Sequence, residues 1–552
     1  MTVSHPDADP SLDVRVEAAS ADLAARRICV PLDRRRVMLW SAALALLLTA
    51  YFAVPFPWPT NRFDTGIPLV AADRILAGEL PYVDFQTLYT PGYYYLVAAA
   101  WSVFGRSFDV YHAVSTGVGL VNILLAFLVA WRLARTPLRA GVAVLAGLAA
   151  AYPYPALAPA LLALIVAADG PKLSGRRVLI AGALAGLAGW FRHDIGAAAT
   201  VALMAAVWTR ARLADDSDTG LVPRAFTLRV LRLPILAGCA ATGVLLLLLS
   251  PALVLAPGRL LEGLVLNPLA TVPFRQGSRS LVEGLLEFGA TGPVFVACAL
   301  LTLFALVVAV VPRRAARWLD PQVPVGLLVG VGVLGLYALR YFVLRPETHH
   351  ILPATLMLGI LGAVRWRGSL RWLSLGRWVW IAVLVCLFVP VYRAAGSRAS
   401  QALGRRSTRV TAVGEFLPGA DHLYLPNQEL SSYRALLKHL DRTVPPGQPL
   451  FSACERHDVI HDQDLLLYFL AQRPAVVFDH HFDPGVTTRA EVQRGIVADL
   501  VAHDVRTIVR FRSRLPASAQ GAMPGSRILD TWIEEHFSWG ATFGRYQVWE
   551  RD

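Results

Sequence analysis

Charged side chains are scarce in this sequence. Only 16% of its 552 residues are Asp, Glu, Lys or Arg, whereas 55% are hydrophobic, and the mean hydropathy is +0.49. Soluble domains carry about 25% charged residues, so this composition excludes an ordinary water-soluble protein. Hydrophobic runs recur between Val37 and Val391, each close to the roughly 20 residues that a helix needs to cross the bilayer. The chain is therefore predicted to be a polytopic α-helical membrane protein.

Cysteine is also rare, with five residues scattered along the chain. Their spacing matches neither a disulfide framework nor a metal-binding pair. Motifs for nucleic-acid recognition are absent as well, although the formal net charge is +13. Because this charge is mostly arginine in the polar breaks between hydrophobic runs, it indicates membrane topology and contact with anionic membrane lipids, and no nucleic-acid partner.

The arginine clusters predict the orientation of the chain, because short cytoplasmic loops retain Lys and Arg. The segment PGYYYLVAAAWSVFG, residues 91–105, is shorter than the roughly 17 residues of a comfortable crossing. Counting it as a crossing would also put Arg132 and Arg139 outside, so it is predicted to lie at the membrane interface. This leaves about eleven crossings, with a range of 11 to 13, over residues 37–55, 109–131, 140–152, 155–168, 178–191, 195–208, 233–256, 291–311, 322–344, 350–364 and 378–392.

These crossings divide the chain into regions. Residues 1–36 are expected to be a disordered cytoplasmic tail, residues 37–392 a transmembrane domain with a first exterior loop over 56–108, and residues 393–424 a juxtamembrane linker. An odd number of crossings places everything after Val391 outside a cytoplasmic membrane, although the arginines at 393–409 would by local charge alone indicate the cytoplasmic side.

Residues 425–552 differ in pattern from the rest. The runs PLFSA, PAVVF and VRTIVRF predict strands, and helical patterns stand around residues 431–440, 464–470 and 489–501. The closing stretch FSWGATFGRYQVWER predicts a hairpin. A small α/β extracytoplasmic domain is therefore expected here. Its stretches HDVIHDQD and FDHHFDP resemble metal ligands in composition but match no zinc or calcium spacing, so they are expected to be solvated loops.

The first exterior loop is the largest polar segment between the predicted helices, and it contains Asp64, Asp73, Glu79 and Asp84. Asp73 stands beside Arg74 in an amphipathic run, which favours a structural ion pair. Asp64, in RFDTG, follows the first crossing closely. A helix cap is one role for it, and a catalytic carboxylate is the other.

Motifs in this loop resemble those of a known family. A first helix, an Asp shortly after it, then A-x-x-I-L-x-G-x-x-P-Y-x-D-F, Y-x-P-G-Y-Y-Y-L and F-G are similar to the GT-C integral-membrane glycosyltransferases, in the branch of protein mannosyltransferases, aminoarabinose transferases and lipopolysaccharide sugar transferases. The resemblance implies a sugar transfer from a polyprenyl phosphate to an extracytoplasmic glycan, lipid or protein hydroxyl. It also implies Asp64 as the general base, with Asp84 as the second choice.

Two cationic patches at predicted exterior helix ends suit a departing phosphate. GWFRHDIG contains Arg192, for which an ion pair with Asp194 that closes a helical hairpin is the structural alternative. LRPETHHILP contains Arg345, His349 and His350, and the resemblance implies that this Arg and His lie near the donor phosphate. No cofactor is predicted; a divalent metal on the histidines with Glu347 is the less favoured alternative, because adjacent histidines point to different sides of a helix.

A hexosyl or pentosyl transferase is not the only function compatible with these features. A secondary transporter or lipid-linked sugar flippase also contains ionisable groups in its helices. Here the polar residues gather on one exterior face, and a soluble domain is attached on the same side, which favours the enzyme. A non-catalytic assembly subunit is the third interpretation.

Overall fold

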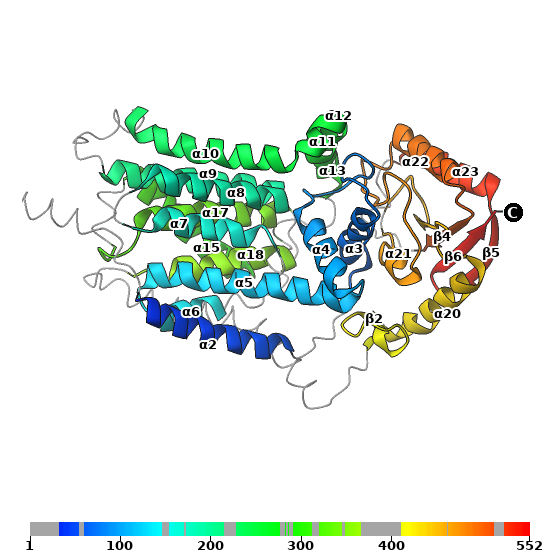
Figure 1. Cartoon of the computed structure of the whole chain (residues 1–552), viewed down its shortest axis with the longest axis horizontal. Helices are drawn as coiled ribbons and strands as arrows, with labels where there is room; N and C mark the ends of the chain where they lie inside the picture. Colours follow the sequence, from blue (N-terminus) through cyan, green and yellow to red (C-terminus); the bar gives the residue numbers. More distant parts are fainter. Residues whose placement is uncertain are drawn as a thin grey trace, which may run out of the picture.

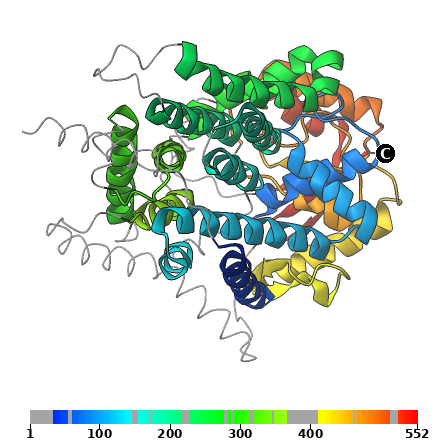
Figure 2. The same cartoon turned by 60° about the vertical axis from the view of Figure 1, so that its left-hand side comes forward.

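The computed structural model describes residues 33–53, 60–145, 154–170, 173–214, 228–275, 282, 285, 291–311, 319–344, 348–365, 410–460, 462–512 and 524–551. Three parts follow one another along the long axis of the molecule (Figure 1): a helical bundle, the first loop (residues 60–107) and the C-terminal region (residues 410–551). Figure 2 shows the same order from a second direction.

Apolar helices form the bundle. Four of them are long and apolar enough to cross a membrane, namely Arg34–Ala53, Phe108–Ala134, Val230–Leu248 and Val325–Leu344. A multi-pass helical fold is thus confirmed, whereas the predicted number of crossings stays a prediction; the segment 378–392 lies outside the described residues. The bundle comprises α2 (Arg34–Ala53), α5 (Phe108–Ala134), α6 (Pro137–Leu145), α7 (Leu157–Ala168), α8 (Gly175–Phe191), α9 (His193–Ala214), α10 (Leu228–Leu248), α15 (Thr291–Val310), α17 (Val325–Leu344) and α18 (Leu352–Gly362).

Small residues allow the helices of the bundle to approach closely. On α8, a Cβ added at Gly182 would stand 2.6 Å from the Ala237 carbonyl oxygen of α10, and one at Gly186 would stand 2.4 Å from that of Ala241. Inside a membrane, helices gain most of their association energy from such close packing. The glycines of α8 therefore set its position, and with it the position of its C-terminal end.

Basic side chains from separate helix ends meet at one end of the bundle. Arg132 pairs with Asp169 at 2.6 Å, Arg365 pairs with Asp320 at 3.1 Å, and Arg177 donates to the Asp169 carbonyl oxygen. These arginines belong to three of the clusters that were predicted to share the cytoplasmic face. They do share one face, and the first loop leaves from the opposite end.

The first loop contains two helices, α3 (Arg62–Leu76) and α4 (Gly92–Phe104). Asn61 caps α3, because its side-chain oxygen accepts hydrogen bonds from the amides of Phe63 and Asp64. Helix α4 has 13 residues, about 20 Å of rise, which is shorter than the hydrocarbon core. A second connection, between α10 and α15, folds as α11 (Ser250–Leu255), α12 (Pro257–Leu261), the π-helix η2 (Glu262–Leu266) and α13 (Asn267–Arg275).

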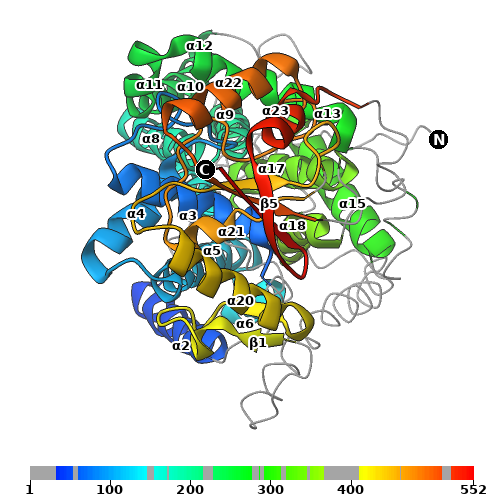
Figure 3. The same cartoon turned by 90° about the vertical axis from the view of Figure 1, so that its right-hand side faces the viewer.

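The C-terminal region surrounds a four-stranded sheet of order β3-β4-β6-β5, in which β3 and β4 are parallel and the other pairs antiparallel (Figure 3). Strands β5 and β6 form the expected hairpin. The elements are β1 (Val410–Ala412), η4 (Val413–Glu415), β2 (Tyr424–Pro426), α20 (Asn427–Thr443), β3 (Phe451–Cys454), α21 (Leu466–Ala471), α22 (Ala490–Ala502), β4 (Thr507–Phe511), α23 (Ile528–His536), β5 (Ser538–Phe543) and β6 (Tyr546–Glu550).

One predicted strand, PAVVF at 474–478, is wrong. Its backbone binds the first loop instead of the sheet: Arg74 Nη1 donates to the Val477 carbonyl at 2.6 Å, and the Gln86 amide donates to that of Phe478 at 2.9 Å. The backbone amide of Phe478 is bound by the Asp499 carboxylate. A strand pattern predicts an extended segment whose backbone needs hydrogen-bond partners, but it does not show whether those partners are another strand or groups elsewhere in the chain.

The first loop and the C-terminal region share one hydrophobic core. Leu69 and Val70 of α3, Val97 and Trp101 of α4, and Leu465–Leu470 around α21 are buried in it together. A bidentate ion pair of Arg106 with Asp73 lies beside this core, and Arg106 also donates to the Phe469 carbonyl oxygen. The C-terminal region therefore lies on the same side of the bundle as the first loop.

Candidate functional site

Asp64 lies in the first turn of α3, on the exposed part of the first loop. Asn61 Nδ2 donates to its Oδ2 at 2.7 Å, while the Asp64 amide donates to Asn61 Oδ1 at 3.0 Å. A carboxylate at this position is stabilised by the positive end of the helix dipole. The carboxylate thus has a fixed place and remains open to solvent, which a base that meets an external hydroxyl requires.

Two tyrosines join α4 to α5 on the side of the first loop that carries Asp64. The rings of Tyr93 and Tyr111 are 6.3 Å apart, and the Tyr93 hydroxyl is hydrogen-bonded to Ser115 Oγ at 2.6 Å. The first turn of α4 is thereby joined to α5.

Asp84 occupies a different place. Its Oδ2 accepts a hydrogen bond from the Leu80 amide at 2.8 Å, and its carbonyl oxygen accepts one from Arg74 at 3.0 Å, so it closes the turn after α3. Helix α3 has 15 residues, about 22 Å, and the two acids belong to opposite ends of it. The structure does not bring Asp64 and Asp84 together.

Arg192 stands between α8 and α9 with its guanidinium buried. Its Nε and Nη2 donate to the two carboxylate oxygens of Asp194 at 2.9 and 3.1 Å, and the Tyr337 hydroxyl donates to Asp194 Oδ2 at 2.6 Å. The ion pair offered as the structural alternative is therefore present. It occupies one edge of the guanidinium and leaves the Nη1 edge outside the pair.

Aromatic rings surround Arg192. Its Cζ lies 4.5 Å from the ring centroid of Tyr89, 5.3 Å from that of Tyr154 and 5.3 Å from that of Tyr341. His350 packs edge-on against Tyr341 with centroids 4.8 Å apart. Arg192 and His350, both predicted to bind the donor phosphate, thus contact the same ring, that of Tyr341. Arg345 and the side chain of His349 lie outside the described residues.

The start of α4 contacts both α5 and α8. Tyr93 packs against Tyr111 of α5, and Thr90 Oγ1 donates to the Gly189 carbonyl oxygen of α8 at 2.8 Å. This tyrosine-rich turn therefore lies between α5 and the end of α8 that carries Arg192. Tyr154, Tyr337 and Tyr341 were not identified as site residues from the sequence. The sequence marks each of them only as a tyrosine near the end of an apolar run.

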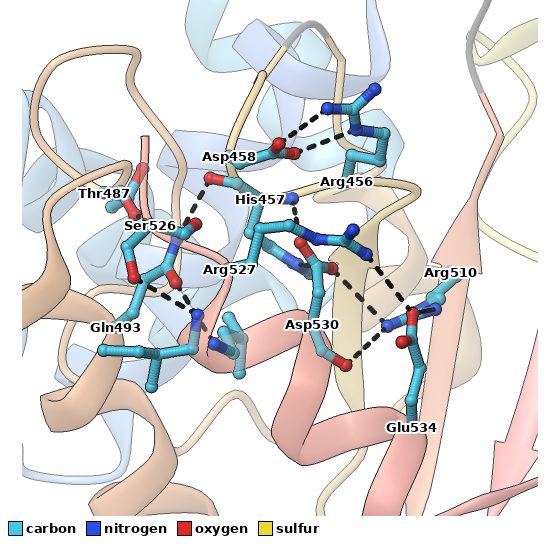
Figure 4. Close-up of polar contacts among 12 residues, drawn as sticks. Arg456, His457, Asp458, Thr487, Gln493, Arg510, Ser526, Arg527, Asp530 and Glu534 are labelled. Carbon is cyan, nitrogen blue, oxygen red and sulfur yellow. Dashed lines mark hydrogen bonds and ion pairs between the residues drawn. The ribbon is translucent and has the colours of Figure 1, made fainter. Parts of the chain in front are cut away.

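The histidine-rich stretches of the C-terminal region are not solvated, so that prediction is wrong. His457, His480 and His481 are all buried. His457 Nδ1 is 2.8 Å from Asp530 Oδ1, and Asp530 is also 3.5 Å from Arg510, in the polar network of Figure 4. The network joins loop, strand and helix as internal structure. Within the described residues, no group of three or more His, Cys, Asp or Glu side chains is placed to hold a metal ion.

The described residues thus form an apolar helical bundle with a polar loop helix and a docked C-terminal region. No family model and no curated protein matches the sequence. Among solved structures, ArnT from Cupriavidus metallidurans bound to undecaprenyl phosphate is similar, with 16% identity over 94% of this chain and 98% of that chain and a TM-score of 0.51. The same protein in the apo state gives 15% identity, 93% and 97% coverage and a TM-score of 0.50.

The chain therefore shares the fold of ArnT, and the fold implied by the loop motifs is confirmed. The likeness covers nearly the whole of both chains, including the C-terminal region. At this identity it establishes the fold alone.

Proposed function

We propose that this protein is a glycosyltransferase of the cytoplasmic membrane that moves a sugar from a polyprenyl phosphate to an acceptor hydroxyl outside. The GT-C fold and the undecaprenyl phosphate bound by the similar ArnT support a lipid-linked donor. The observation that carries the proposal is that the first loop presents an exposed carboxylate, Asp64, and packs the ring of Tyr89 against the buried guanidinium of Arg192.

The proposed reaction needs both groups. The acceptor oxygen forms a bond to the anomeric carbon, and its proton passes to the Asp64 carboxylate. The bond between that carbon and the phosphate oxygen breaks, and its electron pair leaves with the phosphate. Arg192 and His350, with Arg345 and His349 expected nearby, would offset the charge on the departing phosphate. Asp84 remains the second candidate base, although its carboxylate already binds the Leu80 amide.

An isosteric substitution of the base tests the proposal. Asp64→Asn should lower turnover by at least about 10²-fold, because it removes the proton acceptor while its amide oxygen still accepts from Asn61. The measurement is sugar transfer by the purified protein offered a panel of polyprenyl-phosphate sugars. Asp73→Asn is the matched control on the same helix, since Asp73 pairs with Arg106, and it should retain turnover.

The outcomes separate the candidates. Full turnover by Asp64→Asn, with loss in Asp84→Asn, would assign the base to Asp84. A protein that moves the lipid-linked sugar across liposomes without transferring it would be the flippase. The polar first loop lies at one end of the bundle, on the side of the C-terminal region, and this asymmetry favours transfer over transport (Figure 1).

A further inference from the structure

Arg62, two residues before Asp64, is held by the C-terminal region. It pairs with Glu429 of α20, and its Nε lies 3.6 Å from Asp464 Oδ2. The Arg62 side chain is 12% exposed and that of Asp464 is fully buried. The rings of Tyr433 and Phe511 stand 5.9 and 5.5 Å from the guanidinium carbon. These contacts form the clamp, defined here as Arg62, Glu429 and Asp464.

Asp464 is itself fixed on its own side of the interface. Its Oδ2 accepts from the Tyr546 hydroxyl at 2.7 Å, and its Oδ1 accepts from the Leu467 amide at 3.1 Å at the start of α21. The buried carboxylate therefore cannot follow Arg62 if α3 moves. A rigid acceptor of this kind transmits the position of the C-terminal region to the first turn of α3.

The same face of α3 makes a second contact with the C-terminal region at Gly66, and this contact leaves no space for a side chain. A Cβ at Gly66 would stand 2.4 Å from Leu465 Cβ and 2.6 Å from the backbone of Leu465 and Leu466. Arg62 and Gly66 are four residues apart and share one face of α3, whereas Asp64 is rotated about 160–200° from both. The C-terminal region therefore packs against one face of the first turn of α3, and Asp64 lies on the opposite face.

We infer that the C-terminal region is a positioning element of the transfer site, in which the clamp sets the orientation of Asp64 through the first turn of α3. This inference rests on the proposed role of Asp64 as the base. Arg62, Glu429 and Asp464 are positioning residues, because none of them lies on the face that meets the acceptor.

The test compares two ends of the same helix in the full-length protein. Asp464→Asn removes the charge while its amide oxygen still accepts a hydrogen bond, and Glu429→Gln is a milder second variant because Glu429 is 24% exposed. Arg106→Gln is the matched control: it breaks the ion pair with Asp73, in the last turns of α3, and leaves the clamp intact.

Amide hydrogen exchange and steady-state kinetics are measured on each variant. Both clamp variants should exchange faster over residues 60–67 but not over 71–77, and Arg106→Gln should show the reverse. Asp464→Asn should lower kcat about 10- to 100-fold per folded molecule with KM for the lipid donor changed less than about 2-fold, since only the orientation of the base is lost. Arg106→Gln should retain kcat.

Unchanged exchange over 60–67 in both clamp variants would overturn the inference, as would an equal fall in kcat for Asp464→Asn and Arg106→Gln. Full turnover by Asp64→Asn would instead remove Asp64 as the base, and the catalytic part of the inference with it, while the transferase itself would stand. The exchange pattern does not depend on activity, so it still decides whether the clamp orders the first turn of α3.

Discussion

At the residue scale, Arg192 could bind the donor phosphate, or its pair with Asp194 could serve only to close the α8–α9 hairpin. One double substitution separates these two roles. Arg192→Gln should destabilise the protein by about 1–3 kcal/mol, because it leaves the partly buried Asp194 carboxylate without its cation. It should also raise KM for the lipid donor. In the double variant Arg192→Gln/Asp194→Asn no charge is left unpaired, so thermal stability should largely return while KM stays raised. A double variant with a normal KM would reduce the pair to a closure of the α8–α9 hairpin.

Asp479 predicts a pH dependence of stability. Its burial, together with the nearby charges of Glu262 and Asp499, raises the pKa of this carboxyl to about 7, although Arg489 and Arg259 oppose the shift. Between the unfolded pKa, about 4, and 7 the unfolded state loses a proton that the native state keeps, so stability falls as pH rises.

Asp479→Asn should consequently raise the melting temperature at pH 8 by a few degrees and change it little at pH 4. Thermal scans of the variant and the wild type at both pH values measure this difference, which isolates Asp479 from all other titrating groups. An equal shift at both values would contradict the raised pKa.

The residues of the site differ in how far the sequence reveals them. Asp64 follows its own cap by three residues, and Arg192 binds a carboxylate two residues away, so both stand out in a short window. Tyr89, Tyr154 and Tyr341 meet Arg192 from three distant segments. Such contacts follow from helix packing, which no local pattern records. The turn at Asp84 was likewise hidden, because an acid after P-Y-V serves a turn as readily as a catalytic site.

At the scale of elements, the close approach of α8 and α10 should limit substitution of its glycines. In Gly186→Ala the new methyl group would meet the Ala241 carbonyl oxygen and, at 2.9 Å, the Val244 Cβ. Backbone has to move, so we expect a loss of about 1–3 kcal/mol, measured as a lower melting temperature in detergent.

Gly117→Ala on α5 is the control for that substitution, because nothing lies within 4 Å of its added Cβ. It should be neutral or stabilise by about 0.5–1 kcal/mol, the usual gain of alanine over glycine in a helix. If both variants behaved alike, the close packing of α8 and α10 would not limit this position.

The sequence predicted where helices and strands lie along the chain better than it predicted which segments they contact. Hydropathy located the helical segments, since burial in lipid demands long apolar runs whatever their neighbours are. The pattern of PAVVF was equally clear and led to a false strand, because its hydrogen-bond partners, Arg74 and Gln86, stand about 390 residues earlier in the chain.

At the scale of the whole molecule, the arginine clusters and the docked C-terminal region indicate the same orientation of the chain in the membrane. Arg132, Arg177 and Arg365 gather at one end of the bundle, while the first loop and the C-terminal region share a core at the other. Charge counting predicted the first of these facts and also that the first loop and the C-terminal region lie on the same side. Their shared core could not be read from the sequence, because it depends on contacts between distant segments, such as that of Arg62 with Glu429.

Membrane-impermeant thiol labelling in intact cells tests this orientation. Native Cys454 is buried and burial raises its pKa well above normal, so it is a poor probe. Gln448→Cys, exposed in the turn after α20, should be labelled before lysis. Gln322→Cys, exposed at the arginine-rich end beside Arg135, should be labelled only after lysis, and the wild type measures the background. Because the C-terminal region and the first loop share a core, the reverse pattern would move Asp64 into the cytoplasm as well and contradict an external acceptor.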